Sequence, residues 1–212
     1  MEKASTKQQI LDAALDLFSV QGYEGTSIAQ IAEAVGIRKA TMYSHYSSKQ
    51  EILDTLVHDT LEQYDRRSIF ANADWSDPEF TKDKQNLTID TILQAVVGHI
   101  RFVLHNPSVA KSRKMLVLEQ FQNKELSALQ TKQTYTDVMH YFTGFVGFLV
   151  GQGKLVDGDV EIMAAQLCLP VSVWINLCDR EPQREQEVVD LVERHIRQFF
   201  KTYGAESDQP KR

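Results

Sequence analysis

Apolar residues recur at helical spacing along almost the whole chain. From Ile10 they stand at i, i+3, i+4, i+7 and i+8, which places them on one face of a helix. Later segments repeat this period, and none alternates as a strand would. The pattern predicts helices over residues 6–21, 27–35, 38–45, 49–67, 88–105, 108–121, 124–151, 159–178 and 182–203. We therefore expect an all-α protein.

Short motifs mark where several of these helices begin. Ser27 with Gln30, and Ser48 with Glu51, have the spacing of a capping box, in which two side chains satisfy free backbone N–H groups. Gly36 separates the second helix from the third. These signals predict helix starts at residues 27 and 49, and a tight connection between two short helices.

Two stretches interrupt the helical pattern. Residues 71–86 are polar and aperiodic, so we expect a loop there, and the stretch most prone to disorder. Residues 205–212 form a polar tail. Pro170 falls inside the helix at 159–178 and is expected to kink it.

Charge separates the N-terminal part from the rest of the 212 residues. The net charge is −6, which argues against a polycation that coats nucleic acid. Residues 1–50 are neutral overall, and residues 36–50 hold Arg38, Lys39 and Lys49 with no acid. A local basic patch on an acidic protein is therefore predicted.

The cysteines and the apolar runs bear on location. Cys168 and Cys178 lie ten residues apart in one predicted helix, about 15 Å along its axis, too far for a disulfide with each other. Two free thiols fit a reducing cytoplasm. The N-terminus is polar, and the most apolar run, residues 142–150, is too short to span a bilayer. We expect a cytoplasmic protein without a membrane partner.

The two short helices after the first long one describe a helix-turn-helix. Ile28, Ile31, Val35 and Ile37 would pack the pair together. The second helix then keeps an outward face, here called the reading face, of small and polar side chains: Lys39, Ala40, Thr41, Tyr43, Ser44 and His45. A helix of this width fits the major groove of DNA, and no acid on it repels phosphate.

The residues from Ile10 to Leu53 carry a longer ordered pattern. It runs through Ile10-Leu11, Ala14, Leu17-Phe18, Gly22-Tyr23, Thr26-Ser27-Ile28, Ile31-Ala32, Gly36 to Tyr43, His45-Tyr46, Ser48-Lys49 and Glu51 to Leu53. This pattern resembles the DNA-binding domain of the tetracycline-repressor (TetR/AcrR) family over about residues 6–53. Arg38 and Ala40 depart from the Ser and Gly that are frequent there, which leaves the DNA sequence open.

The resemblance implies a role for each matching residue. Lys39, Ala40, Thr41 and Tyr43 would face bases, and Thr26, Ser44, His45 and Lys49 would hold phosphates. The full set of expected DNA-binding residues is Thr26, Ser27, Arg38, Lys39, Ala40, Thr41, Tyr43, Ser44, His45 and Lys49. Met42 and Tyr46 are expected in the core of the three-helix unit. The implied division is a helix-turn-helix domain at 1–47, a helical ligand-binding and dimerisation domain at 48–204, and the tail at 205–212.

Residues 54–212 show no catalytic or cofactor signature. They contain no Gly-rich phosphate loop, no Gly-x-Ser-x-Gly and no Cys-x-x-Cys, and no two histidines stand at i, i+4. We therefore expect neither an enzyme nor a cofactor or metal site.

A glycine stripe suggests where a ligand could lie. Gly144, Gly147 and Gly151 share one face of a predicted helix rich in aromatic residues, although an interior glycine costs about 1 kcal/mol relative to alanine. Either another helix backbone approaches this face or a ligand occupies the space. The candidate ligand-binding residues are His99, Phe102, Tyr141, Gly144, Gly147 and Trp174.

The last helix has an apolar stripe too long to face water. In the family this helix and the one before it pair with their copies, so the stripe is expected at a dimer interface; packing within the monomer is the alternative. The expected interface residues are Val188, Val192, His195, Ile196, Phe199 and Tyr203.

The resemblance implies a one-component transcriptional regulator, most simply a repressor. It would bind palindromic double-stranded DNA as a homodimer and be released by a small-molecule effector that the sequence does not identify. One alternative is a ligand-independent or protein-regulated DNA-binding factor of the same fold. Another is a helical enzyme that only resembles a regulator, which would need convergent titratable groups in a cleft.

Overall fold

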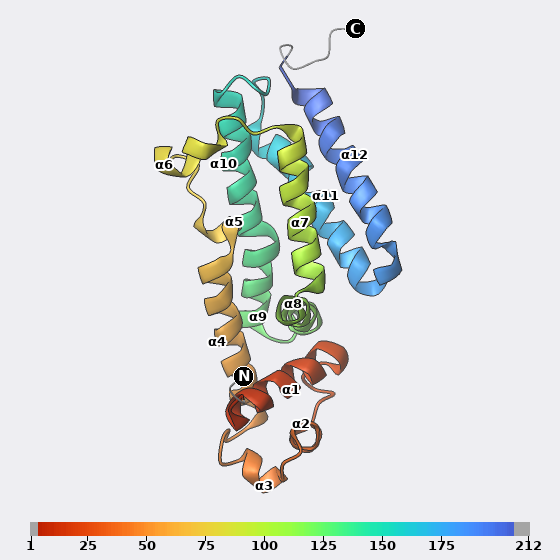
Figure 1. Ribbon diagram of the computed structural model, residues 1–212. Helices are drawn as coiled ribbons and strands as arrows, with labels where there is room; N and C mark the ends of the chain where they lie inside the picture. The colour runs from red at the N-terminus through yellow and green to blue at the C-terminus, as the bar shows by residue number, and fades with distance from the viewer. Residues whose placement is uncertain (1–3, 206–212) are drawn as a thin grey trace. The chain divides into compact units, whose positions relative to one another are not determined.

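The predicted all-α fold is confirmed. The computed structural model describes residues 4–205, and within that range there is no strand, only an isolated bridge between Leu155 and Gly204. The α-helices are α1 (Thr6–Gln21), α2 (Ile28–Val35), α3 (Lys39–Met42), α4 (Lys49–Arg67), α5 (Ile69–Asn72), α6 (Pro78–Thr81), α7 (Ile89–His105), α8 (Pro107–Glu119), α9 (Lys124–Thr131), α10 (Asp137–Gly151), α11 (Val160–Arg180) and α12 (Glu185–Tyr203) (Figure 1). The predicted tail lies, from residue 206 on, outside the described residues.

The helices form two compact units. The first unit takes residues up to Arg67 together with Pro107–Gln130, and so contains α1 to α4, α8 and α9. The second unit takes Ser68–Asn106 and the residues from Thr131 on, and contains α5 to α7 and α10 to α12. The functional division expected at residues 47 and 48 stays a prediction.

In the first unit, α1 lies at the centre and packs against α2, α4 and α8. Its apolar face, predicted from periodicity, is buried: Ile10, Ala14 and Phe18 are fully inaccessible to solvent. Met115 and Leu116 of α8 belong to the same core. The helices of the DNA-binding pattern therefore share their interior with a helix some ninety residues further along the chain.

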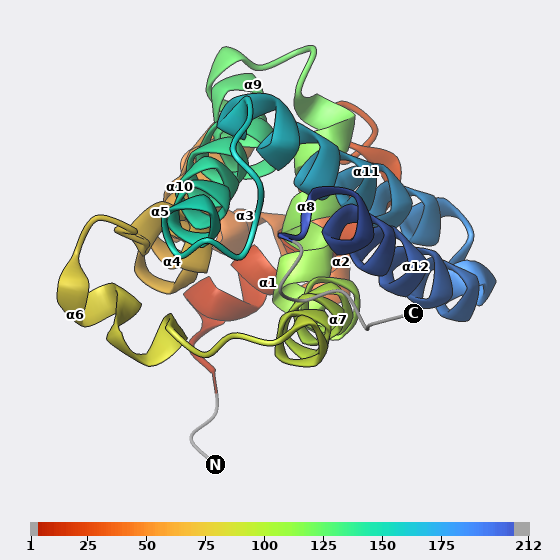
Figure 2. The same cartoon turned by 90° about the horizontal axis from the view of Figure 1, so that it is seen from above.

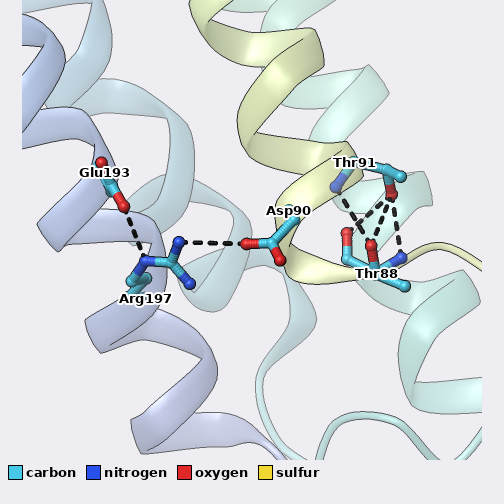
Figure 3. Close-up of polar contacts among 5 residues, drawn as sticks. All are labelled: Thr88, Asp90, Thr91, Glu193 and Arg197. Carbon is cyan, nitrogen blue, oxygen red and sulfur yellow. Dashed lines mark hydrogen bonds and ion pairs between the residues drawn. The ribbon is translucent and has the colours of Figure 1, made fainter.

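In the second unit, α10 packs against α11, and α12 packs against both α11 and α7 (Figure 2). An ion-pair chain ties α12 to the start of α7: Arg197 donates to Glu193 at 3.0 Å and to Asp90 at 3.1 Å (Figure 3). Thr88 and Thr91 cap α7 reciprocally beside this chain. Since the three charged groups are at least half exposed, these ion pairs contribute little to stability.

The stretch 71–86 is more ordered than its polarity predicts. It contains α6 and a 3₁₀ turn at Lys82–Lys84, and Asp77 caps α6 by accepting from the Glu79 N–H at 2.9 Å. Trp75 packs its indole against Phe80, with ring centroids 5.2 Å apart, and against aromatic side chains of α10. The predicted loop was wrong here because side-chain caps and one buried tryptophan supply the order that apolar periodicity does not reveal.

Three predicted helices differ in their limits. The span 124–151 is broken into α9, a π-helical segment at Lys132–Thr136, and α10. The last helix starts with a 3₁₀ turn at Pro182–Arg184, and α3 ends at Met42 rather than at residue 45. Just after α3, the Ser44 hydroxyl donates to the Thr41 carbonyl at 2.7 Å, and this local bond favours a tight turn over a further helical turn.

The apolar stripe of α12 lies inside the second unit of a single chain. Its aliphatic members and Phe199 are at most 5 % exposed: Val188, Val192, Ile196 and Phe199. This burial favours the alternative of packing within the monomer, because side chains already covered by their own chain offer little apolar surface to a second copy; the dimer interface on α12 stays a prediction. The 3.6-residue period predicts that one face of the helix is buried, but it does not predict whether the same chain or a second copy covers that face.

The two polar members of the stripe also have partners within the unit. The His195 ring stands edge-on to Trp174 at 5.4 Å, and its Nε2 lies 3.0 Å from the Leu167 carbonyl. The Tyr203 hydroxyl donates to Gln166 at 2.5 Å. Both residues therefore join α12 to α11.

Candidate nucleic-acid interface

The reading face is exposed as predicted, except at His45. Arg38 precedes the first turn of α3, and the side chains from Arg38 to Thr41, with Tyr43 and Ser44, are open to solvent. Tyr43 is 51 % exposed, unusual for a residue of its size. No acidic residue occurs between positions 34 and 50. The face thus offers cations, hydroxyls and one aromatic ring without a repelling charge.

Two residues anchor this face from behind. Met42 and Tyr46 are 1 % and 2 % exposed, as expected for core positions of the three-helix unit. Their burial orients the short α3, which is too short to be stable by itself. His45, which stands between these two residues in the sequence, is half-buried.

The start of α4 follows the predicted capping in part. The Ser48 hydroxyl accepts from the Glu51 N–H at 3.1 Å, as in a capping box. The Glu51 carboxylate, however, accepts from the Ser47 N–H and hydroxyl at 2.6 and 2.7 Å rather than from Ser48. These hydrogen bonds hold the pKa of Glu51 below its usual range.

Lys49 points into the protein at the first turn of α4. Its ammonium donates to the carbonyl oxygens of Tyr23 and Thr26 at 2.7 and 2.9 Å, and lies 4.0 Å from the centre of the Tyr23 ring. An ammonium has three donors, so one N–H remains for a further acceptor such as a phosphate. Lys49 therefore has a structural function, and the phosphate contact expected of it stays a prediction.

Thr26 and Ser27 stand at the entrance to α2 in different settings. Thr26 is 2 % exposed, and its hydroxyl donates to the Gly22 carbonyl at 2.8 Å. Its side chain is therefore engaged internally. Ser27 is exposed and forms the predicted capping box with Gln30. Of the two, only Ser27 presents its side chain to solvent.

One residue of this region could not be found from the sequence. Glu119, the last residue of α8, is 6 % exposed and accepts from the Tyr23 N–H at 2.7 Å. The two residues stand 96 positions apart. No local motif links them; only the close packing of α1 on α8 brings them together.

The predicted ligand-binding residues divide into two groups. His99 and Tyr141 are both in edge contact with Phe70, at 5.0 and 5.2 Å, and Tyr141 is also 5.3 Å from Trp75. Phe102 is instead 49 % exposed, and Trp174 contacts His195 of α12. Phe70 and Trp75 were missed because both belong to short helices and turns without periodicity.

The glycine stripe of α10 also has a mixed environment. A Cβ at Gly144 would stand 2.5 Å from the Trp75 ring, so that glycine makes room for the indole. A Cβ at Gly147 would be 3.8 Å from Val160, an ordinary contact, and one at Gly151 would meet nothing within 4 Å. The Trp75 side chain therefore explains Gly144. Neither an approaching helix backbone nor an empty space shared by the three glycines is found there among the described residues.

The rings of Phe70, Trp75, His99 and Tyr141 form a cluster, here called the aromatic cluster. Its environment favours the neutral forms of its two titratable members. Burial lowers the pKa of His99 below its usual 6.5 and raises the pKa of Tyr141 above its usual 10. Both shifts disfavour the charged form, as expected where water is excluded. The indole Nε1 of Trp75 is buried there without a hydrogen-bond partner. The cluster therefore suits an uncharged group with an acceptor.

An exposed, acid-free α3 anchored by a three-helix core is the arrangement of a helix-turn-helix domain. The family of bacterial regulatory proteins named tetR matches residues 10–56. Those residues are a TetR-family domain, and the resemblance stated from the sequence is confirmed.

Two curated relatives match the N-terminal part. The biofilm operon icaADBC negative transcriptional regulator IcaR of Staphylococcus epidermidis is 48 % identical over 46 residues, 22 % of this chain and 25 % of the relative. IcaR of Staphylococcus aureus strain Newman is 35 % identical over 88 residues, 42 % of each chain. The matches thus cover a quarter to about two fifths of the relatives' length.

Solved structures extend the likeness to the whole fold. A TetR-family transcriptional regulator from Mesorhizobium loti has a TM-score of 0.63 at 19 % identity and covers 94 % of this chain and 97 % of its own. SmeT, the repressor of a multidrug efflux pump of Stenotrophomonas maltophilia, has a TM-score of 0.60 at 16 % identity, with 96 % and 92 % covered. At these identities the likeness concerns the fold.

Proposed function

We propose that the protein is a transcriptional repressor that binds double-stranded DNA through α3. The observation that carries the proposal is the reading face, which is exposed, free of acids and oriented by buried Met42 and Tyr46. IcaR is named a negative regulator, and SmeT a repressor. In this proposal Arg38 to Thr41 with Tyr43 face bases, and Ser27, Ser44, His45 and the free N–H of Lys49 contact phosphates.

The repressor acts as a homodimer, and its interface lies on α11. Along one side of α11 runs a shallow groove lined by Ile162, Ala165, Gln166, Leu169, Pro170 and Val173. Ile162 and Val173 are 54 % and 64 % exposed, so the chain leaves a continuous apolar face uncovered. By length and composition alone α11 could also cross a membrane, and only 22 % of its most apolar window is buried within the chain. A second copy would cover this face.

Two identical reading heads require a symmetric operator. Half-sites should lie about 34–36 Å apart, one helical turn of DNA, or a multiple of it. The test is selection of bound sequences from a random duplex pool. An inverted repeat supports the proposal; sequence-random or only asymmetric DNA contradicts it. A Val173→Asp variant that still sediments as a dimer would place the interface elsewhere.

A small molecule that binds the aromatic cluster would release the DNA. His99, Tyr141 and the unpartnered indole N–H of Trp75 are the polar groups there, and all are uncharged. SmeT has been solved in complex with triclosan, an example for a protein of similar fold. Compounds are screened for release of the selected operator, with Tyr141→Phe as the variant expected to change the response.

A ligand-independent factor of the same fold is the second candidate. It is favoured by the placement of Trp75, which already fills the space above Gly144. If no compound that raises the melting temperature of the protein alters operator binding, this second candidate is preferred. Its DNA-binding face would be the same.

A further inference from the structure

The turn between α1 and α2, residues 22–26, is held by two helices that come from elsewhere in the sequence. The Tyr23 N–H donates to Glu119 of α8 at 2.7 Å, and the Tyr23 carbonyl accepts from Lys49 of α4 at 2.7 Å. The Tyr23 hydroxyl also donates to Gln50 of α4 at 3.0 Å. One residue of the turn is therefore tied to α8 through its N–H group and to α4 through its carbonyl and side chain.

The residue before Tyr23 leaves room for the carboxylate. Gly22 has a φ of +77°, a backbone conformation that residues with a Cβ rarely adopt. A Cβ at Gly22 would lie 3.1 Å from the Glu119 Oε1, tighter than an ordinary contact. Glycine thus allows both the turn and the approach of Glu119.

The hydrogen bonds within the turn make it act as one piece. The Thr26 N–H donates to the Tyr23 carbonyl at 3.1 Å, and the Thr26 hydroxyl donates to the Gly22 carbonyl at 2.8 Å. The next residue, Ser27, is the N-cap of α2. A displacement of Tyr23 would therefore be passed to the N-cap of α2, and α2 packs directly on α3.

Glu119 is an unusual residue for a site that only needs filling. Burying a carboxylate costs more free energy than burying an amide or an apolar group, unless the charge is used in a hydrogen bond. At 6 % exposure its oxygen is directed at a single backbone N–H of the turn. Through this hydrogen bond the position of α8 determines the position of the turn.

We propose that Glu119 is a positioning residue for the DNA-binding head: through the Tyr23 N–H, α8 sets the α1–α2 turn and with it the presentation of α3. The proposal rests on the proposed function, because its output is operator binding. It adds that α8 controls this binding without contacting DNA.

The experiment compares Glu119→Ala, Glu119→Asp and Glu119→Gln with the parent. Asp16→Asn is the matched control, because it removes the ion pair of Asp16 with Lys111, which also joins α1 to α8 but does not touch the turn. Hydrogen exchange of the peptide that contains Tyr23, operator affinity at several salt concentrations, and melting temperature are measured for each variant.

We expect faster exchange at Tyr23 and about tenfold weaker operator binding for the alanine and aspartate variants. The aspartate keeps the charge but its carboxylate stands one methylene further back. The slope of affinity against salt should stay unchanged, since no phosphate contact is removed. Glutamine should restore exchange and affinity to within about threefold, because its amide oxygen can accept the same N–H.

Several results would overturn the proposal. A variant that melts lower but binds operator like the parent would make Glu119 purely structural. Equal losses for glutamine and alanine, or a loss for Asp16→Asn as large as for Glu119→Ala, would also refute it. If the parent selects no DNA sequence, the proposed function fails; unchanged Tyr23 exchange in Glu119→Asp would then independently refute the hold on the turn.

Discussion

Replacing Lys49 with methionine tests two functions of one side chain. Methionine keeps the apolar stem but removes all three donors. The hydrogen bonds to Tyr23 and Thr26 are then lost, with the contact over the Tyr23 ring at 4.0 Å. Hydrogen bonds from a charged donor contribute about 1.5–3 kcal/mol each, and an exposed cation–π contact about 0.5–1 kcal/mol.

The loss should be smaller than this sum. Lys49 is only half-buried, so water can reach the released carbonyls, and the Tyr23 carbonyl keeps the Thr26 N–H. We expect a destabilisation of about 1–3 kcal/mol. For a chain of this length that corresponds to a fall in melting temperature of about 2–12 °C.

Operator binding of the same variant reports the remaining donor. If that N–H contacts a phosphate, the slope of log affinity against log salt should fall by about 0.9. Lys39→Met is the control: Lys39 is exposed and has no ion-pair partner among the described residues, so its loss should leave stability within about 0.5 kcal/mol while altering base preference. A Lys49→Met protein as stable as the parent would refute the structural function. An unchanged slope of log affinity against log salt would refute the phosphate contact.

Three further predictions concern the second unit. Gly144→Ala should lower the melting temperature because its methyl group meets the indole at 2.5 Å, an overpacking cost of about 1–3 kcal/mol, whereas Gly147→Ala should be neutral or stabilising by up to about 1 kcal/mol; equal effects would contradict the packing. Val173→Asp should give a folded monomer in sedimentation, whereas Phe199→Asp should unfold the unit; a folded Phe199→Asp monomer would instead restore the α12 interface. Stability should fall as the pH drops below about 6.5, because burial lowers the pKa of His99 and the unfolded chain takes up the proton first. His99→Leu should flatten that pH dependence, and an unchanged slope would assign it to other groups.

Features set by neighbours in the sequence were predictable. The capping box of Ser27 and Gln30 is present as expected, and so is the helix start after Ser48, because such bonds span three residues. The buried positions of Met42 and Tyr46 followed from the ordered pattern around them.

Features set by tertiary packing could not be predicted from the sequence. The partner of Tyr23 is Glu119, and nothing near either residue indicates the other. The stripe of α12 had the right period, but periodicity cannot tell a monomer core from an interface. Trp75 lies in a polar stretch whose order comes from helix caps and from aromatic rings of α10, and neither leaves a periodic pattern in the sequence.

The two tryptophans of the chain, Trp75 and Trp174, both lie in the second unit. Indole fluorescence is therefore silent about the helix-turn-helix. A thermal melt followed by fluorescence reports the loss of the aromatic cluster and of the α11–α12 packing, while the reading head could unfold earlier without a signal. Circular dichroism, which sees every helix, must be recorded alongside. Only if both transitions coincide do the units unfold together, and only then does one melting temperature describe the whole protein.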